Sequence, residues 1–385
     1  MISKFKNILR FIIYLLVNIF VTPSKNIEQK KFLLIRLDAI GDYVLFRNFI
    51  KVLKESDKYK DYSFTFVGND NWKGLSEELD GQYIDEFIWV NKNKFTRNLV
   101  YRYKKLKSIA LFGYEVILCP VYSRDFFDTD MLVKIINATE KIGSDGDLSN
   151  INRWQKKIGD KYYDKIIPAN DSILFEFDRN KEFFENFLDV KLEIYRPNIS
   201  LNCKKIQFNL PHKYAILFIG ASSITKQWSI ENFAKVGKHI KEKYGHDIVL
   251  CGAPNDREAA LKFSLYFKDT YIDLVGKTSL IELLQVFSKG NLMVSNETVA
   301  PHMAVALNMA SVIVIYSGRH YGRFAPYPKE MSPNYHLVYH PEIKENLIDY
   351  SKVSNSNSYK NSLDINEIKV DMVTQKIKEA LIMNG

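Results

Sequence analysis

Apolar runs and helically spaced segments alternate along the first third of the chain. Strand-like runs cover 31–37, 62–67, 86–90 and 114–121, and helical spacing covers 43–54 and 95–109. Strands that alternate with helices in this way form parallel sheets with helices on both faces. We therefore expect a doubly wound α/β domain in this part of the chain.

A second alternating block begins after residue 205 and is more regular than the first. Its strand-like runs are 213–220, 246–252, 271–276, 291–296 and 311–318, and its helical segments are 229–245, 255–267, 279–290 and 300–308. This pattern predicts a second doubly wound domain. The low-complexity segment 351–362 predicts a mobile loop, and a final helix is expected over 365–383.

The stretch between the two blocks is less regular. We expect surface structure over the polar residues 144–165, a helix with a Phe-rich apolar face over 175–188, and a linker over 195–205, which contains Pro197. The expected division of the chain is therefore 1–25, a basic apolar segment, 26–195, an N-terminal domain, and 196–385, a C-terminal domain.

The first 22 residues combine three basic side chains with an apolar run that only Asn18 interrupts. A signal peptide, a membrane-spanning helix and a helix lying in the headgroup region are the alternatives. The run, Phe11 to Val21, is shorter than the roughly 20 residues that a span requires, and no small-x-small cleavage site follows it. We expect a basic interfacial, membrane-associating helix, with a short span as the second hypothesis and a helix packed on the protein's own core as the third.

Composition fits a folded two-domain protein and adds a charge signal. A chain of 385 residues is too long for one ordinary core. Its residues are 46% hydrophobic and 26% charged, which is too apolar for a protein that is disordered throughout. The formal net charge of +9 fits a polyanionic partner, which could be nucleic acid, an anionic membrane or an acidic substrate. Cys119, Cys203 and Cys251 lie far apart with no CxxC pair or histidine spacing, so we expect buried free thiols and no metal site.

Polar clusters follow four of the predicted strands, at 38–42, 220–228, 251–256 and 295–302. Each lies at a strand-to-helix junction, where a short polar turn is needed in any case. Ligands of doubly wound sheets bind outside the carboxyl ends of the strands, and two such domains that face one another form a cleft there. We therefore expect the four clusters to line a binding site.

The cluster GASSITKQW has the features of an anion site. Its small residues, including Ser222 and Ser223, let backbone N–H groups approach a diphosphate, and Lys226 adds a point charge. A plain strand-to-helix loop with an exposed lysine is the simpler alternative for this loop taken alone.

The cluster SNETVAPH places Thr298 and the N–H groups of Val299 and Ala300 at a helix start, where the helix dipole favours negative charge. His302 falls in the first turn, where it could donate to a phosphate oxygen or be satisfied by a backbone carbonyl. Glu297 could face a ligand or could be an acid that offsets the helix dipole.

The cluster DAIGD carries two carboxylates at the mouth of a buried strand. Gly41 permits a close or positive-φ turn, and Asp42 stands at the start of the following helix. Asp42 is either an N-cap or a carboxylate at the cleft that accepts the proton of an attacking hydroxyl, a contribution of about 10²–10⁴-fold for general bases. For Asp38 we expect a turn-stabilising role.

Two apparent nucleotide motifs do not match their full patterns. The segment VGKTS resembles the end of a phosphate-binding GxxxxGK[ST] loop, but the first glycine would fall at Tyr271. The segment GAPND lacks the GxGxxG pattern, which argues against an NAD enzyme.

Five stretches, in their order and spacing, resemble one known family. They are LLIRLDAIGDYVLFRNFIKVLK, FIGASSITKQWSIENFAKV, IVLCGAPNDRE, LVGKTSLIELLQVFSKGNLMVSNET and HMAVALNMASVIVIYSG. From Lys31 to about Gly318 the chain resembles glycosyltransferase family 9, the bacterial lipopolysaccharide heptosyltransferases. The resemblance implies two Rossmann-like domains in the GT-B arrangement, which face a central cleft, and a nucleotide-diphosphate sugar donor, typically ADP-heptose.

The resemblance also implies roles for single residues on the donor side. Asp42 matches the family's catalytic base, and Lys226 matches the lysine that contacts the donor phosphates. Thr298 and the following N–H groups, with His302, match the pyrophosphate-binding turn. Asp256 lies near the position of an acid that helps to hold the nucleoside.

On the acceptor side, Arg124 falls where a basic residue is common in the family, and Gly41 belongs to the same site. One turn departs from the family pattern, because Glu297-Thr298-Val299 replaces the usual Asp-Thr/Ser-Gly. The carboxylate is one methylene longer and the glycine is lost, so sugar or base specificity could differ.

The implied mechanism is a single in-line displacement. An acceptor hydroxyl attacks the anomeric carbon, Asp42 takes its proton, and the diphosphate leaves toward Lys226 and the helix that begins at Thr298. The expected partners are the nucleotide sugar as donor substrate, with no further cofactor and no metal, and a lipid-linked glycan acceptor. The expected location is the cytoplasmic face of the inner membrane, where a basic helix would concentrate the enzyme.

Two alternative functions stay open. One keeps the fold and the transferase activity but changes the nucleotide sugar, and the other is a non-catalytic nucleotide- or glycan-binding relative. Nucleic-acid binding, which the charge alone suggests, has no motif support.

Overall fold

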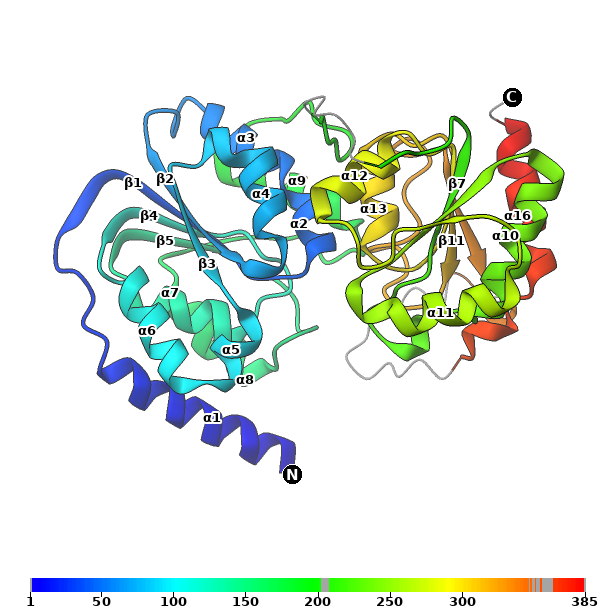
Figure 1. Ribbon diagram of the computed structural model, residues 1–385. Helices are drawn as coiled ribbons and strands as arrows, with labels where there is room; N and C mark the ends of the chain where they lie inside the picture. Colours follow the sequence, from blue (N-terminus) through cyan, green and yellow to red (C-terminus); the bar gives the residue numbers. More distant parts are fainter. Residues whose placement is uncertain are drawn as a thin grey trace. The chain divides into compact units, whose positions relative to one another are not determined.

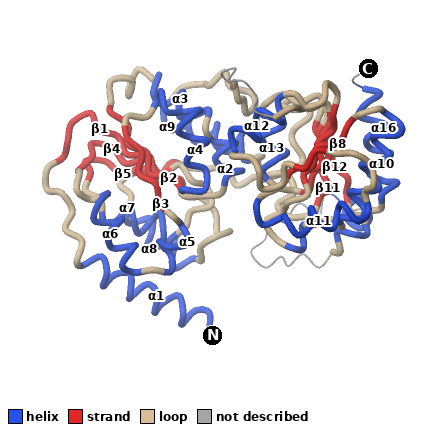
Figure 2. The backbone as a smooth tube through the Cα atoms, viewed as in Figure 1, coloured by secondary structure: helices blue, strands red, loops and turns tan. Residues whose placement is uncertain are grey.

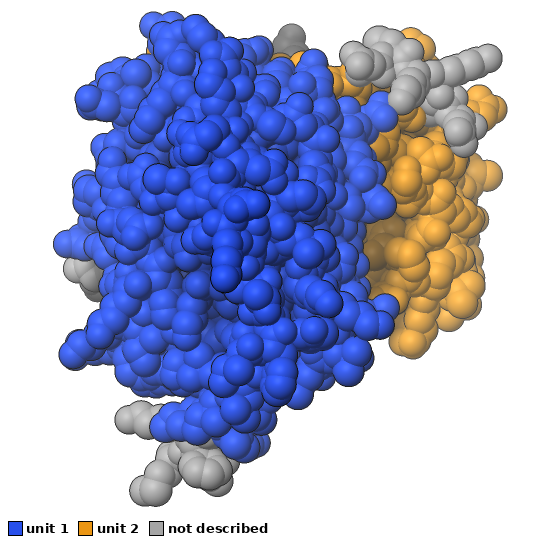
Figure 3. All heavy atoms as spheres, turned by 90° about the vertical axis from the view of Figure 1, so that its left-hand side faces the viewer, with its two compact units in different colours: residues 1–172, 178–194 blue, residues 173–177, 195–385 orange. Residues whose placement is uncertain are grey.

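The computed structural model describes residues 2–201, 208–345, 347, 350, 354 and 363–383. The chain divides into two compact units, unit 1 with residues 1–172 and 178–194 and unit 2 with residues 173–177 and 195–385 (Figure 3). Apart from residue 354, the predicted mobile loop lies outside the described residues, as do residues 202–205 of the predicted linker.

Unit 1 is built on a six-stranded parallel sheet in the order β3-β2-β1-β4-β5-β6 (Figure 1). Its strands are β1 (Ile27–Arg36), β2 (Ser63–Asn69), β3 (Glu86–Val90), β4 (Gly113–Cys119), β5 (Ala138–Ser144) and β6 (Lys165–Ile167). Its helices are α1 (Ile2–Ile19), α2 (Ile40–Phe46), α3 (Asn48–Glu55), α4 (Lys73–Asp80), α5 (Lys92–Arg97), α6 (Leu99–Ile109), α7 (Met131–Ile135), α8 (Arg153–Gly159) and α9 (Glu176–Leu188), with a π-helical turn η3 (Phe126–Asp130) before α7. The second half of β1 is wholly buried, as its continuous apolar run predicts for a central parallel strand.

Unit 2 repeats the plan with a six-stranded parallel sheet in the order β12-β11-β10-β7-β8-β9. Its strands are β7 (Tyr214–Phe218), β8 (Asp247–Cys251), β9 (Ile272–Asp273), β10 (Leu292–Asn296), β11 (Val312–Tyr316) and β12 (Tyr335–Tyr339). Its helices are α10 (Ile230–Tyr244), α11 (Arg257–Tyr266), α12 (Leu280–Ser288), α13 (Val299–Ala306), α14 (Pro341–Lys344) and α16 (Val370–Met383), with short turns η5 (Ile224–Lys226), η6 (Pro254–Asp256) and η7 (Ile365–Glu367). The two alternating blocks of the sequence therefore form two parallel α/β sheets, as predicted.

Two predicted helices are each divided in the structure. The segment 43–54 forms parts of α2 and α3, which meet at Arg47. The segment 95–109 forms parts of α5 and α6, because Asn98 ends α5 and its side chain accepts the Tyr101 N–H at 2.9 Å to cap α6. An asparagine side chain competes with the helix backbone in this way, and helical spacing alone does not reveal the break.

The Phe-rich helix is α9, and its apolar face packs on the core of unit 1. The ring of Phe184 stacks on Phe49 at 5.2 Å between centroids, and Phe187 stacks on Tyr59 at 5.5 Å. The polar stretch 144–165, predicted as surface structure, contains α8 and reaches the edge strand β6. The sheet of unit 1 is thus two strands wider, by β5 and β6, than the apolar runs of the sequence suggest.

The N-terminal helix α1 packs on unit 1 through one of its faces (Figure 2). Tyr14 is 2% exposed, its hydroxyl donates to the Thr96 carbonyl oxygen at 2.6 Å, and its ring joins Phe126 and Phe127 in an apolar cluster. The third hypothesis for this segment, a helix packed on the protein's own core, therefore holds for that face. None of the described helices combines the length and the apolar character that crossing a membrane requires.

Candidate functional site

An ion pair lies at the carboxyl edge of the unit 2 sheet. The ammonium of Lys226 is 2.9 Å from Oε1 of Glu297, and the two side chains are 17% and 12% exposed. Oε2 of Glu297 accepts hydrogen bonds from the Ser317 hydroxyl at 2.5 Å and from its N–H at 3.3 Å. The simpler alternative for Lys226, an exposed lysine on a plain loop, is therefore wrong.

The strand order explains why Glu297 and Ser317 meet. Glu297 follows β10, Ser317 follows β11, and the two strands are neighbours in the sheet. The carboxyl ends of neighbouring parallel strands lie at one edge, so residues 20 positions apart become partners. Glu297 thereby fixes the Lys226 ammonium against the end of β11.

Asn296 holds the loop that carries Lys226. It is fully buried at the end of β10. Its Nδ2 donates to the Ile219 carbonyl oxygen at 2.8 Å, and its Oδ1 accepts the Trp228 N–H at 3.0 Å. Both ends of the GASSITKQW loop are thus tied to β10, which limits where Lys226 can lie.

Ser222 and Ser223 are exposed in the same loop. The Ser223 hydroxyl lies 3.0 Å from the Thr225 hydroxyl. Their contact with a donor diphosphate stays a prediction.

The first turn of α13 begins immediately after Glu297. Thr298 is the N-cap, and its side chain makes no capping hydrogen bond. Val299 and Ala300 occupy the first two helical positions, where backbone N–H groups have no acceptor within the helix. Because Glu297 binds Lys226, the lysine lies beside this helix start, and an anion there would meet both an ammonium and the positive end of a helix dipole.

His302 is buried in the same turn and has a hydroxyl partner. Its Nδ1 lies 2.8 Å from the Tyr327 hydroxyl, so the described partner is neither a phosphate nor a backbone carbonyl. Burial, with a smaller effect of the Lys226 charge, lowers the pKa of His302 to about 4. The imidazole is therefore neutral near pH 7 and can donate from one nitrogen only.

Asp256 lies at the next strand end and is 8% exposed. Its Oδ2 accepts the Ala253 N–H at 2.7 Å, and burial raises the pKa of its carboxyl group. A β-carbon at Gly220 would overlap this oxygen, and one at Gly252 would lie 3.0 Å from it. The carboxyl group thus fills a space that two glycines leave open, and its contact with a nucleoside stays a prediction.

In unit 1, the turn before α2 is fixed by buried polar side chains. Arg36, which is fully buried, donates to the Asp38 carboxylate at 2.7 Å and to Asn180 Oδ1 at 3.0 Å. The Asp38 carbonyl oxygen accepts from Trp72 Nε1 at 3.2 Å and from Asn69 Nδ2 at 3.1 Å. Asp38 is therefore the turn-stabilising acid that the sequence predicts.

Asp42 is the third residue of α2 and is half-buried. The N-cap of α2 is Ala39, so the alternative that Asp42 is an N-cap is wrong. Gly41 is helical, and its φ is not positive, which corrects the expectation of a glycine turn. The chain turns one step earlier, between β1 and Ile40, so Asp42 enters the first helical turn instead. Its role as a base, like the acceptor contact of Gly41, stays a prediction.

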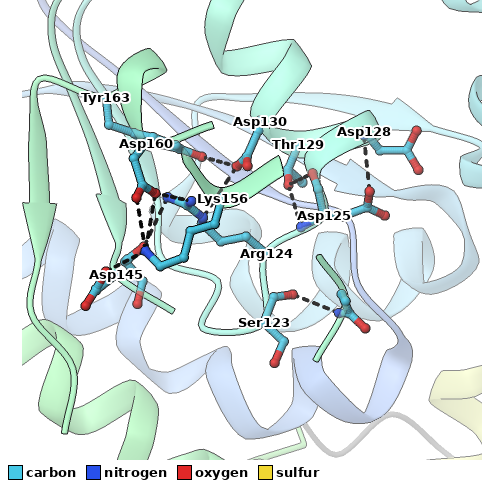
Figure 4. Close-up of polar contacts among 12 residues, drawn as sticks. Ser123, Arg124, Asp125, Asp128, Thr129, Asp130, Asp145, Lys156, Asp160 and Tyr163 are labelled. Carbon is cyan, nitrogen blue, oxygen red and sulfur yellow. Dashed lines mark hydrogen bonds and ion pairs between the residues drawn. The ribbon is translucent and has the colours of Figure 1, made fainter. Parts of the chain in front are cut away.

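Arg124 lies in the interior of unit 1 (Figure 4). Its guanidinium donates to Asp160 and to the Ser144 carbonyl oxygen, lies 3.8 Å from Asp130, and stacks on the Tyr163 ring. Burial raises the pKa of Asp130 to about 6, although the Tyr163 hydroxyl donates to that carboxyl group at 2.7 Å. This geometry supports a structural role for Arg124, and its acceptor contact stays a prediction.

One group in the described ranges has the spacing of metal ligands, namely His340, Glu342 and Glu367. Nδ1 of His340 accepts the Glu342 N–H at 3.3 Å and caps α14, so the proton of the neutral ring lies on Nε2, 3.2 Å from Glu367 Oε2. A protonated nitrogen cannot ligate a metal. The geometry therefore fits a helix cap better than a metal site.

The predicted buried free thiols are confirmed for Cys119 and Cys251. Burial raises the pKa of the Cys119 thiol to about 12. Cys203 lies outside the described residues.

Comparison with known proteins identifies the family. Residues 121–346 match the family model described as glycosyltransferase family 9 (heptosyltransferase). The chain belongs to this family. The resemblance inferred from the five sequence stretches is thereby confirmed, and this family 9 protein is a glycosyltransferase.

Solved family 9 structures share the fold. The glycosyl transferase family 9 protein of Veillonella parvula is 17% identical and matches with a TM-score of 0.70, over 94% of this chain and 100% of that one. E. coli heptosyltransferase WaaC with ADP-2-deoxy-2-fluoro heptose is 17% identical, with a TM-score of 0.64 over 91% and 99%. E. coli ADP-heptose LPS heptosyltransferase II is 15% identical, with a TM-score of 0.60 over 92% and 99%. The fold is therefore the GT-B type with two parallel six-stranded α/β sheets.

A curated relative matches over a shorter stretch. The lipopolysaccharide core heptosyltransferase OpsX of Haemophilus influenzae is 29% identical over 109 residues. The match covers 28% of this family 9 chain and 31% of the length of OpsX.

Proposed function

We propose that this family 9 protein transfers a sugar, most simply heptose from ADP-heptose, to a lipopolysaccharide core or related glycan acceptor. The observation that carries the proposal is the Lys226–Glu297 pair beside the first turn of α13. This arrangement offers an anion the Lys226 ammonium, whose charge Glu297 partly offsets, and the backbone N–H groups of a helix start at the same place. A nucleotide-diphosphate sugar has its diphosphate as the matching group.

The leaving group is the step that this arrangement serves. When the anomeric carbon–oxygen bond breaks, negative charge grows on the diphosphate oxygens. Fixed donors stabilise that charge without reorganising during the reaction, and removal of one such donor typically costs about 10²–10³-fold in rate. In the proposal, Lys226 and the N–H groups of Val299 and Ala300 are these donors.

Asp42 is the proposed base for the attacking acceptor hydroxyl. Its place in the first turn of α2 is set by the turn around Asp38, which Arg36 and Trp72 hold. A base must keep its position relative to the reacting hydroxyl, since small displacements lower the rate steeply. Arg36 and Asp38 are therefore proposed as positioning residues for Asp42.

A second candidate keeps the fold and changes the donor sugar. Both oxygens of the Glu297 carboxylate already have partners within the protein, Lys226 on one and Ser317 on the other. A carboxylate engaged in this way is less able to bind sugar hydroxyls than a shorter aspartate would be. A family 9 transferase that uses another nucleotide sugar is therefore the second candidate.

A panel of ligands tests the proposal. Thermal unfolding is followed with ADP, ADP-heptose, UDP-, GDP- and CMP-sugars, because a ligand that binds only the folded state raises the unfolding temperature. We expect ADP and ADP-heptose to give the largest shift, and transfer to a lipopolysaccharide core acceptor to follow with that donor. A larger shift with another nucleotide would identify a different donor, and no shift with any of these ligands would overturn the proposed donor site.

A further inference from the structure

The outward face of α1 carries a stripe of exposed apolar side chains. They are Ile8, Leu9, Ile12, Leu16 and Ile19, with Phe20 directly after the helix, and they are between 48% and 73% exposed. Spacings of three and four residues place such side chains on one side of a helix. Tyr14, which is buried, lies on the side that packs on unit 1. The helix therefore has two apolar faces, and only one of them is covered.

The exposed stripe cannot turn inward, because α1 is fixed on its other face. The Tyr14 hydroxyl binds Thr96, and the Arg102 guanidinium lies 3.7 Å from the centroid of the Tyr14 ring. Arg10 lies 3.7 Å from the Asp128 carboxylate and 4.2 Å from the centroid of the Phe127 ring. Rotation of α1 to bury the stripe would break all of these contacts.

The apolar surface continues onto the junction of α5 and α6. Leu99 and Val100 are 42% and 63% exposed there. They stand between Thr96 and Arg102, both of which contact Tyr14, so the junction adjoins the middle of α1. Figures 1 and 2 show α1 running beside α5 and α6 with its opposite side uncovered. More than half of the large apolar side chains that the described residues expose belong to α1, to Phe20 directly after it, to this junction or to Leu111 after α6.

The same two segments carry positive charge without any acid. Residues 1–27 and 91–114 contain no Asp or Glu and include eleven Lys and Arg residues. Exposed basic side chains of α5 and α6 that form no ion pair with any described residue are Lys94, Arg97, Lys104 and Lys107. An exposed apolar stripe flanked by uncompensated positive charge is the pattern of surfaces that enter the headgroup region of anionic membranes.

We infer that α1 and the α5–α6 junction form one docking surface for an anionic lipid bilayer, the lipid-docking face. The charge distribution favours a bilayer over a second copy of the chain, because self-association through this face would bring two acid-free basic surfaces together. The inference rests on the proposed function only where it says what docking is for, namely to bring the enzyme to a lipid-linked acceptor. Docking itself requires no donor and no turnover.

Vesicle flotation with the full chain tests the inference. Binding to phosphatidylcholine vesicles that contain phosphatidylglycerol is compared with binding to pure phosphatidylcholine vesicles, at low and high salt. We expect binding that needs the anionic lipid and weakens with salt. The Ile12→Asn/Leu16→Asn variant should lower partitioning by about tenfold or more, because two side chains no longer enter the acyl boundary. The Lys104→Glu/Lys107→Glu variant should lower binding to anionic vesicles and leave the weak binding to neutral vesicles unchanged.

A matched control exists on unit 2. Leu261 and Leu265 of α11 are 62% and 65% exposed, and their helix carries Glu258 in its first turn. Leu261→Asn/Leu265→Asn should leave vesicle binding unchanged. Equal binding by wild type and the α1 variant, or equal loss in the α11 control, would overturn the inference.

Two further measurements distinguish lipid docking from self-association and from donor binding. A dimer in solution that the Ile12→Asn/Leu16→Asn substitutions dissociate would assign the stripe to a second copy and overturn the inference. Calorimetric binding of the nucleotide sugar to the same variants reports on the proposed function alone. Lost docking with intact donor binding supports the lipid-docking face, whereas intact docking without donor binding would count against the proposed function only.

Discussion

The ammonium of Lys226 is held 2.9 Å from the Glu297 carboxylate, whose other oxygen binds Ser317. The pair places a positive and a negative charge side by side at the start of α13. A diphosphate that binds there gains from the lysine and is opposed by the glutamate. Donor affinity therefore depends on both partners, and removal of one changes what the other does.

Lys226→Ala should weaken nucleotide-sugar binding by about tenfold or more, since a hydrogen bond to a charged group contributes about 1.5–3 kcal/mol. The variant leaves the Glu297 carboxylate without its ion-pair partner beside the diphosphate. Addition of Glu297→Gln should then restore part of the affinity, because the repulsion is removed. Isothermal titration calorimetry of the two single variants and the double variant measures this coupling.

Lys235→Ala is the matched control, because Lys235 forms an exposed ion pair with Glu231 on α10. It should bind the donor as wild type does. If the double variant binds no better than Lys226→Ala alone, Glu297 does not oppose the diphosphate.

Asp42→Asn should lower the turnover number by about 10²–10⁴-fold, which is the contribution of a general base. The donor dissociation constant should stay unchanged, because Asp42 is proposed to act on the acceptor hydroxyl. Steady-state kinetics with a soluble acceptor analogue, together with donor titration, separate the two effects. Turnover at the wild-type rate would remove Asp42 from the mechanism.

Tyr14→Ala should lower the free energy of unfolding by about 3 kcal/mol, the lower end of the usual cost of truncating a buried aromatic side chain. Its ring covers Phe126 and Phe127, and its hydroxyl binds Thr96. For the same reason, deletion of the first 22 residues should uncover an apolar cluster and destabilise unit 1 as well as remove a lipid contact. Urea unfolding followed by fluorescence gives the energies.

Leu16→Ala is the control for the previous prediction, because Leu16 is 53% exposed on the same helix. It should change stability by no more than about 0.5 kcal/mol. Equal effects of the two substitutions would mean that α1 does not pack through Tyr14.

His302 should make stability depend on pH in the acidic range. Burial lowers its pKa from the ordinary value of about 6.5 to about 4, so between these values the unfolded chain binds more protons than the folded chain. The neutral ring contributes about 3 kcal/mol to the free energy of unfolding above pH 6.5, and this contribution is lost as the pH falls toward 4. His302→Gln should lose less stability than wild type between pH 7 and pH 4.5 in urea titrations. Parallel curves for the two proteins would contradict the shifted pKa.

The alternation of strands and helices predicts both sheets and most of their strands, because central parallel strands are continuous apolar runs. The role of Asp38 was also predictable, since a carboxylate at the mouth of a buried strand needs a partner, which is Arg36. Ser317 was not predictable as a partner of Glu297. That contact depends on β10 and β11 being neighbours in the sheet. The order of strands in a sheet cannot be predicted from the spacing of apolar residues within each strand.

The N-terminal helix shows the same limit. Apolar side chains surround most of α1, so periodicity cannot separate the face that packs on Phe126 and Phe127 from the face that stays exposed. Two hypotheses that looked exclusive in the sequence, core packing and an apolar surface, apply to opposite sides of one helix. Arg124 is the opposite case, because a basic residue after a strand suggests a ligand contact but its partners Asp160 and Asp130 come from elsewhere in unit 1.

The Asp256 carboxyl group between Gly220 and Gly252 has a consequence for how this sequence can change over evolution. A side chain at either glycine requires a smaller residue at 256, and a smaller residue there leaves the Ala253 N–H without its acceptor and opens a void. The three positions therefore constrain one another although they lie on two different strand ends. Homologous chains should keep all three together or replace them together.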